Sequence, residues 1–372
     1  MVTARVRGWL WLWIRLVVVA AVVTLELTLQ ARAALTERLR PVQEPRTRLE
    51  RPRRAYLPFT VQHLHPLYWF FFPLEPEQRL ALRNDVCSLD KDGYREPGPA
   101  FANGRKLAVL LGGSSAFGHF ASSNATTITS YMNRLQPEYF FINAGVPSWN
   151  STQELTRLSI EVLNLHPAVV IVLDGANDAS LVDLGLQADG SVRYPAGTPE
   201  NFDQLETIVD EAQHPWSRLT LPRLFPEITN RIEKYTQHEG APVTVAPQTV
   251  RMAAERYVQN LVHMAALSEK AGARFVAAFQ PIAGLHAHVP AAQIDRAEYA
   301  DKQLFRDAAL AARPPSLPLH DLSNAFDADL AIVPVADDEI RDDTIFVDAV
   351  HLTDRGNELM AHHLLRILAA QP

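Results

Sequence analysis

A serine at the end of an apolar run is the first candidate for chemistry in this sequence. The stretch VLLGGSSAFG, residues 109–118, places Ser114 and Ser115 directly after two glycines. A buried strand followed by a tight turn would present such a hydroxyl at the start of a helix, where N–H groups point toward developing negative charge. The spacing G-x-S-x-x-x-G favours Ser114 over Ser115 as a nucleophile.

A histidine and an aspartate near the C-terminus are suited to activate that serine. A serine hydroxyl needs a base to take its proton and a carboxylate to orient the base. In the stretch DAVH, Asp348 precedes His351 by three residues, so a single loop can present both side chains. Each pattern is common by itself. Their order along the chain, each after a predicted strand, is the specific evidence.

Two further loops offer donors for the negative oxygen that develops during ester hydrolysis. Gly145, in NAGVPSWN, could supply a backbone N–H, and Asn177, in GAND, could supply a side-chain amide. Three neighbouring polar residues are candidates for substrate binding: Ser115, Asp178 and Gln280.

Alternating strands and helices position these candidates. Apolar runs predict strands at 107–111, 140–144, 168–173 and 274–279, and helical spacing of apolar residues predicts helices between them. Thr127 and Ser151 are expected helix caps, the second with Glu154 in a capping box. This pattern predicts a three-layer α/β/α domain around a central, mostly parallel sheet, in which ligands bind beyond the carboxyl ends of the strands.

Taken together, the four blocks resemble those of the SGNH hydrolase superfamily, which includes the GDSL-type esterases. The blocks are GGSSAFG, NAGVPSWN, GAND and DAVH, and the resemblance covers roughly residues 95–370. It implies an SGNH/flavodoxin-like fold with no metal and no organic cofactor. The aspartate that usually precedes the nucleophile in this family is Gly113 here.

The resemblance also implies a role for each site residue. Ser114 would be the nucleophile, with His351 as its base and Asp348 orienting that base. The oxyanion hole would consist of the Ser114 N–H, Gly145 and Asn177.

The predicted activity is hydrolysis of acyl esters, with acetyl groups on an envelope or exported carbohydrate as the favoured substrate. An O-acyltransferase, or a lipase or thioesterase with the same triad, stays open as an alternative. So does an inactive glycan-binding homologue, although the intact Ser, Asn, Asp and His argue against it. An α/β-hydrolase would place its acid far from its histidine.

Composition excludes some other classes. The chain of 372 residues has a net charge of −7 and no long basic stripe in its folded part, so no nucleic-acid partner is expected. The single cysteine, Cys87, rules out an intramolecular disulfide framework. No spacing of Cys and His resembles a zinc site.

The N-terminal part predicts membrane attachment. Residues 1–34 contain an apolar run whose length suits a bilayer crossing, with a cleaved signal peptide as the alternative. We expect the catalytic domain to be extracytoplasmic, as a single-pass anchored or secreted protein. Residues 35–95 read as a solvated, arginine- and proline-rich linker to about residue 60, followed by an aromatic segment that forms a lid or meets the membrane. The hydrolase domain then spans 96–372, with an insertion at about 183–245.

Overall fold

The computed structural model describes most of the predicted hydrolase domain. The described residues are 24, 28, 50–60, 63–65, 67–72, 75–180, 246–287, 299–327 and 344–370. Nearly all of the predicted anchor and all of the predicted insertion at 183–245 therefore lie outside the described residues. Among the residues described, no helix is long and apolar enough to cross a bilayer.

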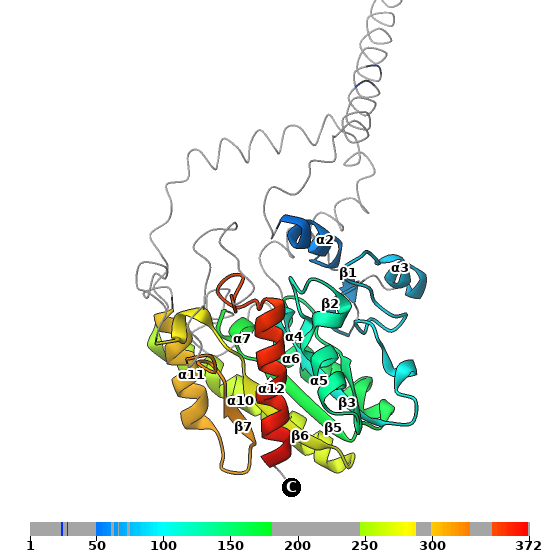
Figure 1. Cartoon of the computed structure of the whole chain (residues 1–372). Helices are drawn as coiled ribbons and strands as arrows, with labels where there is room; N and C mark the ends of the chain where they lie inside the picture. The colour runs from blue at the N-terminus through cyan, green and yellow to red at the C-terminus, as the bar shows by residue number, and fades with distance from the viewer. Residues whose placement is uncertain are drawn as a thin grey trace, which may run out of the picture. The chain divides into compact units, whose positions relative to one another are not determined.

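A five-stranded parallel sheet forms the centre of the domain, in the strand order β4-β3-β5-β6-β7 (Figure 1). Its strands are β3 (Lys106–Gly112), β4 (Tyr139–Asn143), β5 (Val169–Asp174), β6 (Arg274–Phe279) and β7 (Leu319–Asp321). The first four confirm the predicted strands to within two residues. All six residues of β5 are buried, as expected for a parallel strand that is covered on both faces.

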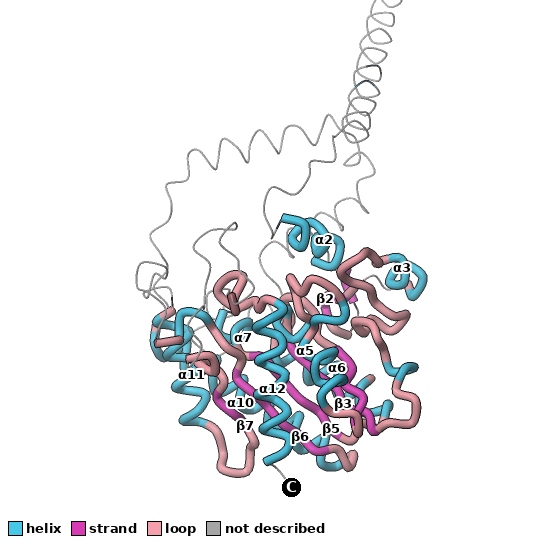
Figure 2. Tube along the Cα trace, in the orientation of Figure 1, coloured by secondary structure: helices cyan, strands magenta, loops and turns pink. Residues whose placement is uncertain are grey.

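Helices cover both faces of this sheet and complete the three layers (Figure 2). On one face, α5 (Ile128–Leu135) packs against α12 (Asp354–Ala370). On the other, α6 (Ser151–Ile160) and α11 (Ala300–Ala312) both pack against the long helix α10 (Pro247–Lys270). The predicted three-layer α/β/α fold is confirmed.

The order of the strands brings two loops together. The chain steps from β3 outward to β4, and then returns across β3 to β5, so the direction of winding reverses at β3. At such a reversal the connections leave on opposite faces and open a crevice beyond the carboxyl ends of the strands. The segments after β3 and β5 are the short helices α4 (Ser114–Phe117) and α7 (Ala176–Ser180), which begin at this crevice.

One predicted cap is confirmed and the other is displaced by one residue. Thr127 caps α5, and its side chain accepts a hydrogen bond from the Ser130 N–H at 3.2 Å. The cap of α6 is Asn150, which forms a capping box with Gln153. The predicted cap, Ser151, is the first residue inside this helix, so its hydroxyl is available for another partner.

A second, aromatic core lies beside the main one and is built from the N-terminal elements. It joins α2 (Glu50–Thr60) and the hairpin of β1 (His63–His65) and β2 (Trp69–Phe71), with α3 (Pro76–Ala81) following in the chain. Its buried aromatic residues are Tyr56, Phe59, Tyr68, Phe71, Phe72, Phe117 and Trp149.

This second core bears on two predictions, the solvated linker up to about residue 60 and the aromatic segment that follows it. The interpretation of residues up to about 60 as a solvated linker is wrong for its last part, because Tyr56 and Phe59 of α2 are fully buried. The sequence missed this because the arginines and prolines around these two rings outweigh them in composition. In the aromatic segment, Tyr68, Phe71 and Phe72 are buried against the domain, which favours a packed lid over a membrane contact.

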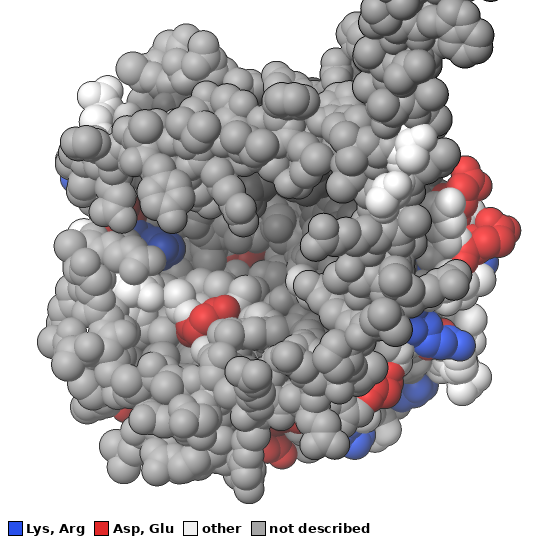
Figure 3. Space-filling model, turned by 90° about the horizontal axis from the view of Figure 1, so that it is seen from above, with Lys and Arg blue, Asp and Glu red and all other residues white. Residues whose placement is uncertain are grey.

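Charges on the visible upper face do not gather by sign. Figure 3 views the molecule from above, and the acidic and basic side chains that are described there are interspersed. The described part of that face therefore has no cluster of basic side chains that would bind a polyanion.

Candidate active site

The nucleophile candidate lies at the turn between β3 and α4. Ser114 is the first residue of α4, directly after the N-cap Gly113, and its side chain is half-buried. The helix ends after a single turn at Gly118, whose left-handed φ of +79° a side chain would strain. The strand therefore delivers the Ser114 hydroxyl to the crevice, as the glycine spacing predicts.

The structure brings Ser114, His351 and Asp348 into one hydrogen-bonded line. His351 Nε2 lies 2.8 Å from Ser114 Oγ, and His351 Nδ1 lies 2.7 Å from Asp348 Oδ2. Both distances are those of strong hydrogen bonds. The three side chains therefore have the geometry of a nucleophile, a base and an orienting acid.

The loop that carries His351 is held by its own backbone. Asp348 Oδ1 accepts hydrogen bonds from the N–H groups of Val350 and His351, at 3.0 and 2.9 Å. Burial alone would raise the pKa of Asp348, but the hydrogen bond from His351 and these backbone donors lower it to about 2. Asp348 is therefore charged at neutral pH and holds the proton of His351 on Nδ1.

Asn177 lies against the turn that precedes the nucleophile. Its Nδ2 donates to the Trp149 carbonyl at 2.6 Å, which leaves its second amide hydrogen for another acceptor. A Cβ atom on Gly113 would lie 2.6 Å from this Nδ2 and 3.1 Å from the Trp149 carbonyl oxygen. A glycine at position 113 thus makes room for this close approach.

Gly145, whose N–H is predicted to serve the oxyanion hole, uses this donor within its own loop. Its N–H donates to Asn143 Oδ1 at 3.0 Å, so this donor is already engaged. A Cβ here would lie 2.5 Å from the Phe117 nitrogen, so the role of Gly145 is close packing against α4. In the same loop Ser148 is exposed and has a left-handed φ of +65°. No sequence pattern had pointed to this serine.

Two of the three predicted substrate-binding residues stand behind the catalytic loop. Ser115 and Gln280 are buried, and Gln280 Nε2 donates to Ser115 Oγ at 3.0 Å. Ser115 Oγ in turn donates to the Val350 carbonyl at 2.8 Å, next to His351. The Ser115 hydroxyl and the Gln280 amide N–H thus have partners inside the protein, and a direct contact of these two residues with substrate stays a prediction. They connect α4 to the loop of the base.

The third, Asp178, is also buried and serves the loop after β4. Ser151 donates to it from its hydroxyl at 2.5 Å and from its N–H at 3.1 Å. Asp178 therefore connects α7 to the start of α6 at Ser151. Ser151 lies two residues after Trp149, whose carbonyl accepts the hydrogen bond from Asn177.

Asp178 belongs to a buried cluster of three carboxyl groups, with Glu154 and Asp174. Burial and the neighbouring carboxylates raise the pKa of Glu154 well above its usual value, and they raise that of Asp174 to about 8. Burial, opposed by hydrogen bonds from Ser151, raises the pKa of Asp178 to about 6. Tyr257 donates to Asp174 at 2.7 Å. At neutral pH the cluster retains protons.

Sequence and structure comparisons add the following. No family model and no curated protein matches this sequence. A GDSL-like lipase from Bacteroides thetaiotaomicron is similar over 71% of this chain and 89% of its own, with 16% identity and a TM-score of 0.33. An acetyl xylan esterase is similar over 70% of this chain and 98% of its own, with 14% identity and a TM-score of 0.37.

A third solved structure is a two-domain esterase active on acetylated mannans. The similarity covers 71% of this chain, with 14% identity and a TM-score of 0.37. It covers about half (49%) of the length of that enzyme. The solved structures similar to this chain thus include esterases and a GDSL-like lipase.

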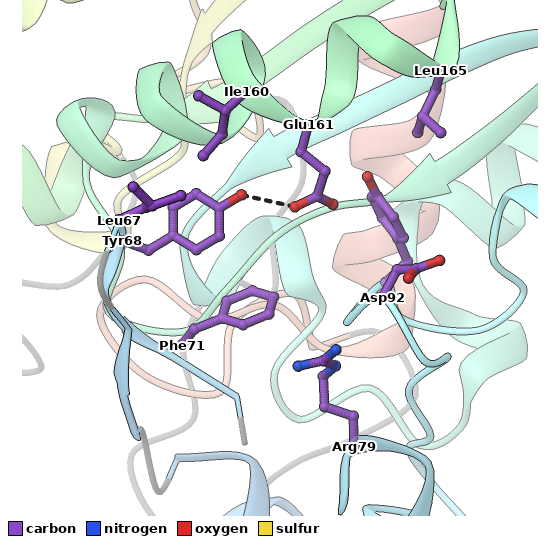
Figure 4. Close-up of a pocket in the computed structure, with 9 residues that line it drawn as sticks. Leu67, Tyr68, Phe71, Arg79, Asp92, Ile160, Glu161 and Leu165 are labelled. Atoms are coloured by element: carbon purple, nitrogen blue, oxygen red, sulfur yellow. Dashed lines mark hydrogen bonds between the residues drawn. The ribbon is translucent and has the colours of Figure 1, made fainter. Parts of the chain in front are cut away.

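A separate pocket of about 470 Å³ lies between the β1–β2 hairpin and the end of α6 (Figure 4). Its lining includes Tyr68, whose hydroxyl donates to Glu161 at 2.8 Å, and the guanidinium of Arg79. None of the triad residues lines it. Within the described residues, no group of three or more His, Cys, Asp or Glu side chains could hold a metal ion.

Proposed function

We propose that this chain is a serine esterase of the SGNH type that forms an acyl-enzyme on Ser114. The observation that carries the proposal is the continuous line of hydrogen bonds from Asp348 through His351 to Ser114, located at the crevice of the sheet. Three residues from two distant parts of the chain meet there in the order that acyl transfer requires.

The proposed reaction begins with attack of Ser114 Oγ on the ester carbonyl. His351 Nε2 takes the hydroxyl proton, while Asp348 holds the imidazole in the correct tautomer and stabilises its positive charge. The collapse of the tetrahedral intermediate breaks the bond to the alcohol, which leaves with the proton from His351. Water then attacks the acyl-enzyme with His351 again as the base, and releases the carboxylic acid and free Ser114.

The oxyanion would be held by the free hydrogen of Asn177 Nδ2 and by the Ser114 N–H. We propose the Ser148 N–H as a third donor in place of Gly145. The support is that Gly145 is engaged by Asn143, whereas Ser148 is exposed one residue before the Trp149 carbonyl that Asn177 contacts.

For the substrate we propose acetyl or another short acyl ester on a carbohydrate of the cell envelope or an exported one. The predicted N-terminal anchor supports this, since it would hold the domain at the outer surface of a membrane. Water and a sugar hydroxyl can both accept the acyl group, so the assay should measure acid and transferred ester together.

The test is hydrolysis of p-nitrophenyl acetate by the full chain in detergent micelles. Ser114→Ala and His351→Ala should each lower kcat by about 10⁴-fold or more, with an unchanged thermal midpoint. Ser115→Ala is the matched control and should keep most of the activity, because it removes only two hydrogen bonds behind the site. Equal rates for Ser114→Ala and wild type, or a folded wild type that cleaves no ester, would overturn the proposal.

A further inference from the structure

The imidazole of His351 is contacted by two rings from the loop that follows α4. The ring centroids of His119 and Phe120 lie 5.1 and 5.2 Å from that of His351, and the Phe120 ring meets it at 87°. Asp348 holds only one of the two ring nitrogens of His351, Nδ1. The two rings therefore limit how far the base can tilt away from Ser114.

His119 acts in this contact as an uncharged ring. Burial, together with the nearby His351, lowers the pKa of His119 to about 3. Its Nδ1 has no hydrogen-bond partner among the described residues. His119 therefore does not compete for the proton of His351 at neutral pH, and its contribution is packing.

The loop that presents these rings has an unusual backbone. Gly118 has a φ of +79° and Phe120 a φ of +71°, and the second value is costly for a residue with a large side chain. Such a conformation persists only where surrounding groups hold it in place.

A buried arginine and a tyrosine supply that support. Arg95 Nη1 donates to the carbonyls of Phe117 and Gly118, at 2.9 and 2.7 Å. The Tyr56 hydroxyl lies 3.0 Å from the Gly118 carbonyl and 2.9 Å from the Ala121 carbonyl, so it spans the loop. Arg95 Nη2 also donates to this hydroxyl at 2.7 Å, which orients its hydrogen toward the loop.

Tyr56 also touches His119 directly. The two ring centroids are 4.6 Å apart. Tyr56 is fully buried although it belongs to α2, the helix at the N-terminal edge of the described domain. A chain of contacts therefore runs from α2 through His119 to the catalytic base.

We propose that Tyr56 of helix α2 is a positioning residue for catalysis, which holds the loop 118–121 so that His119 and Phe120 brace the imidazole of His351. The inference rests on the proposed roles of Ser114 and His351. It gives helix α2, which the sequence predicts to be part of a solvated linker, a role in positioning the catalytic base.

The experiment compares two substitutions on the same helix in the full chain. Tyr56→Phe keeps the ring and removes only the hydroxyl that spans the loop. Phe59→Leu is the matched control: Phe59 is equally buried in the second core, and its ring contacts are to Tyr56 and Phe117, not to His119 or His351. The two should have similar thermal midpoints, so a difference in activity is not a difference in folding.

We expect Tyr56→Phe to lower kcat for p-nitrophenyl acetate about tenfold with little change in KM, because a misplaced base weakens the transition state more than binding. The reaction of Ser114 with a fluorophosphonate probe should slow in parallel. The low-field proton resonance of His351 Nδ1–H should shift or broaden. Phe59→Leu should stay within about twofold of wild type in all three.

Substitution of His119 separates packing from chemistry. His119→Ala should lower kcat, and His119→Phe should recover most of that loss, since a ring without nitrogens can still pack against His351.

Two results would count against the proposal in different ways. If the probe labels wild type and Tyr56→Phe equally fast, and the Nδ1–H resonance is unchanged, Tyr56 is merely structural and this inference fails alone. If folded wild type is neither labelled nor active, the proposed function fails and the inference falls with it.

Discussion

The carboxyl groups on the two sides of Ser114 have pKa values that shift in opposite directions. On the base side, Asp348 accepts hydrogen bonds from His351 and two backbone N–H groups, and its pKa falls to about 2. On the oxyanion side, Glu154 and Asp174 are buried together and their pKa values rise. The same kind of group is therefore charged where donors converge and neutral where carboxyl groups face one another.

This difference explains unpaired atoms on the oxyanion side. Both oxygens of Glu154 and Oδ2 of Asp174 have no hydrogen-bond partner among the described residues when both groups are taken as anions. A proton on Glu154 resolves this, because the acid can then donate to Asp174. Glu154 and Asp174 therefore keep their protons at neutral pH, whereas Asp178, whose pKa is about 6, and Asp348 are mostly charged.

The largest expected effect is on the base side. Asp348→Asn should lower kcat by about 10⁴-fold, because an amide cannot hold His351 in the required tautomer or stabilise its cation. Asp178→Asn is the corresponding substitution on the oxyanion side, and it should lower kcat far less than Asp348→Asn does. Steady-state kinetics measure kcat for both variants. Similar decreases in kcat would show that the two sides do not differ in this way.

Substitution of Gly113 should affect the oxyanion side selectively. Gly113→Ala places a Cβ 2.6 Å from Asn177 Nδ2, so the amide must move. We expect kcat to fall by about 10- to 100-fold, with little change in KM, since full loss of an oxyanion donor costs about 10²–10³. In a double-mutant cycle with Asn177→Ala the two losses should not add. Full additivity would mean that Gly113 acts through another group.

The charge states also predict a pH dependence of stability. The folded state binds protons at Asp174 more tightly than the unfolded chain, so this contribution is complete below about pH 4 and is lost as the pH rises through about 8. The contribution of Asp348 to stability has the opposite pH dependence, because its pKa is lowered in the folded state, and it is lost only as the pH falls through about 2.

Urea unfolding at about pH 5 and pH 8 tests this, with Asp174→Asn beside wild type. The free energy of unfolding should fall more steeply with pH in wild type than in the variant. Parallel pH profiles would indicate that Asp174 titrates normally in the folded protein.

The smallest effect is expected for Glu154→Gln. An amide replaces a carboxyl that is already uncharged, so the free energy of unfolding at neutral pH should change by no more than about 1 kcal/mol. Glu154→Ala, which leaves a cavity, should cost about 2 kcal/mol or more. A large loss for the glutamine variant would mean that Glu154 is charged, and the contrast between the two sides would disappear.

Much of the site follows from where residues lie along the chain. Ser114 and Asn177 each follow a predicted strand, and the winding rules for parallel sheets place such residues at one edge. Thr127 caps its helix as predicted because a cap depends on residues three positions away. Ser115 and Gln280 have suitable types and positions, yet both point into the protein, a direction that no local pattern specifies.

What the sequence determines by itself is the order of strands and helices, the loops that meet at the crevice, and the identity of the candidate triad. These follow because apolar periodicity and chain connectivity act over short stretches. Only the tertiary structure decides that the Gly145 N–H is engaged by Asn143, and that Tyr56 stands behind His119. Hydrogen bonds and ring contacts depend on distance and direction between segments far apart in the chain, and packing alone sets those.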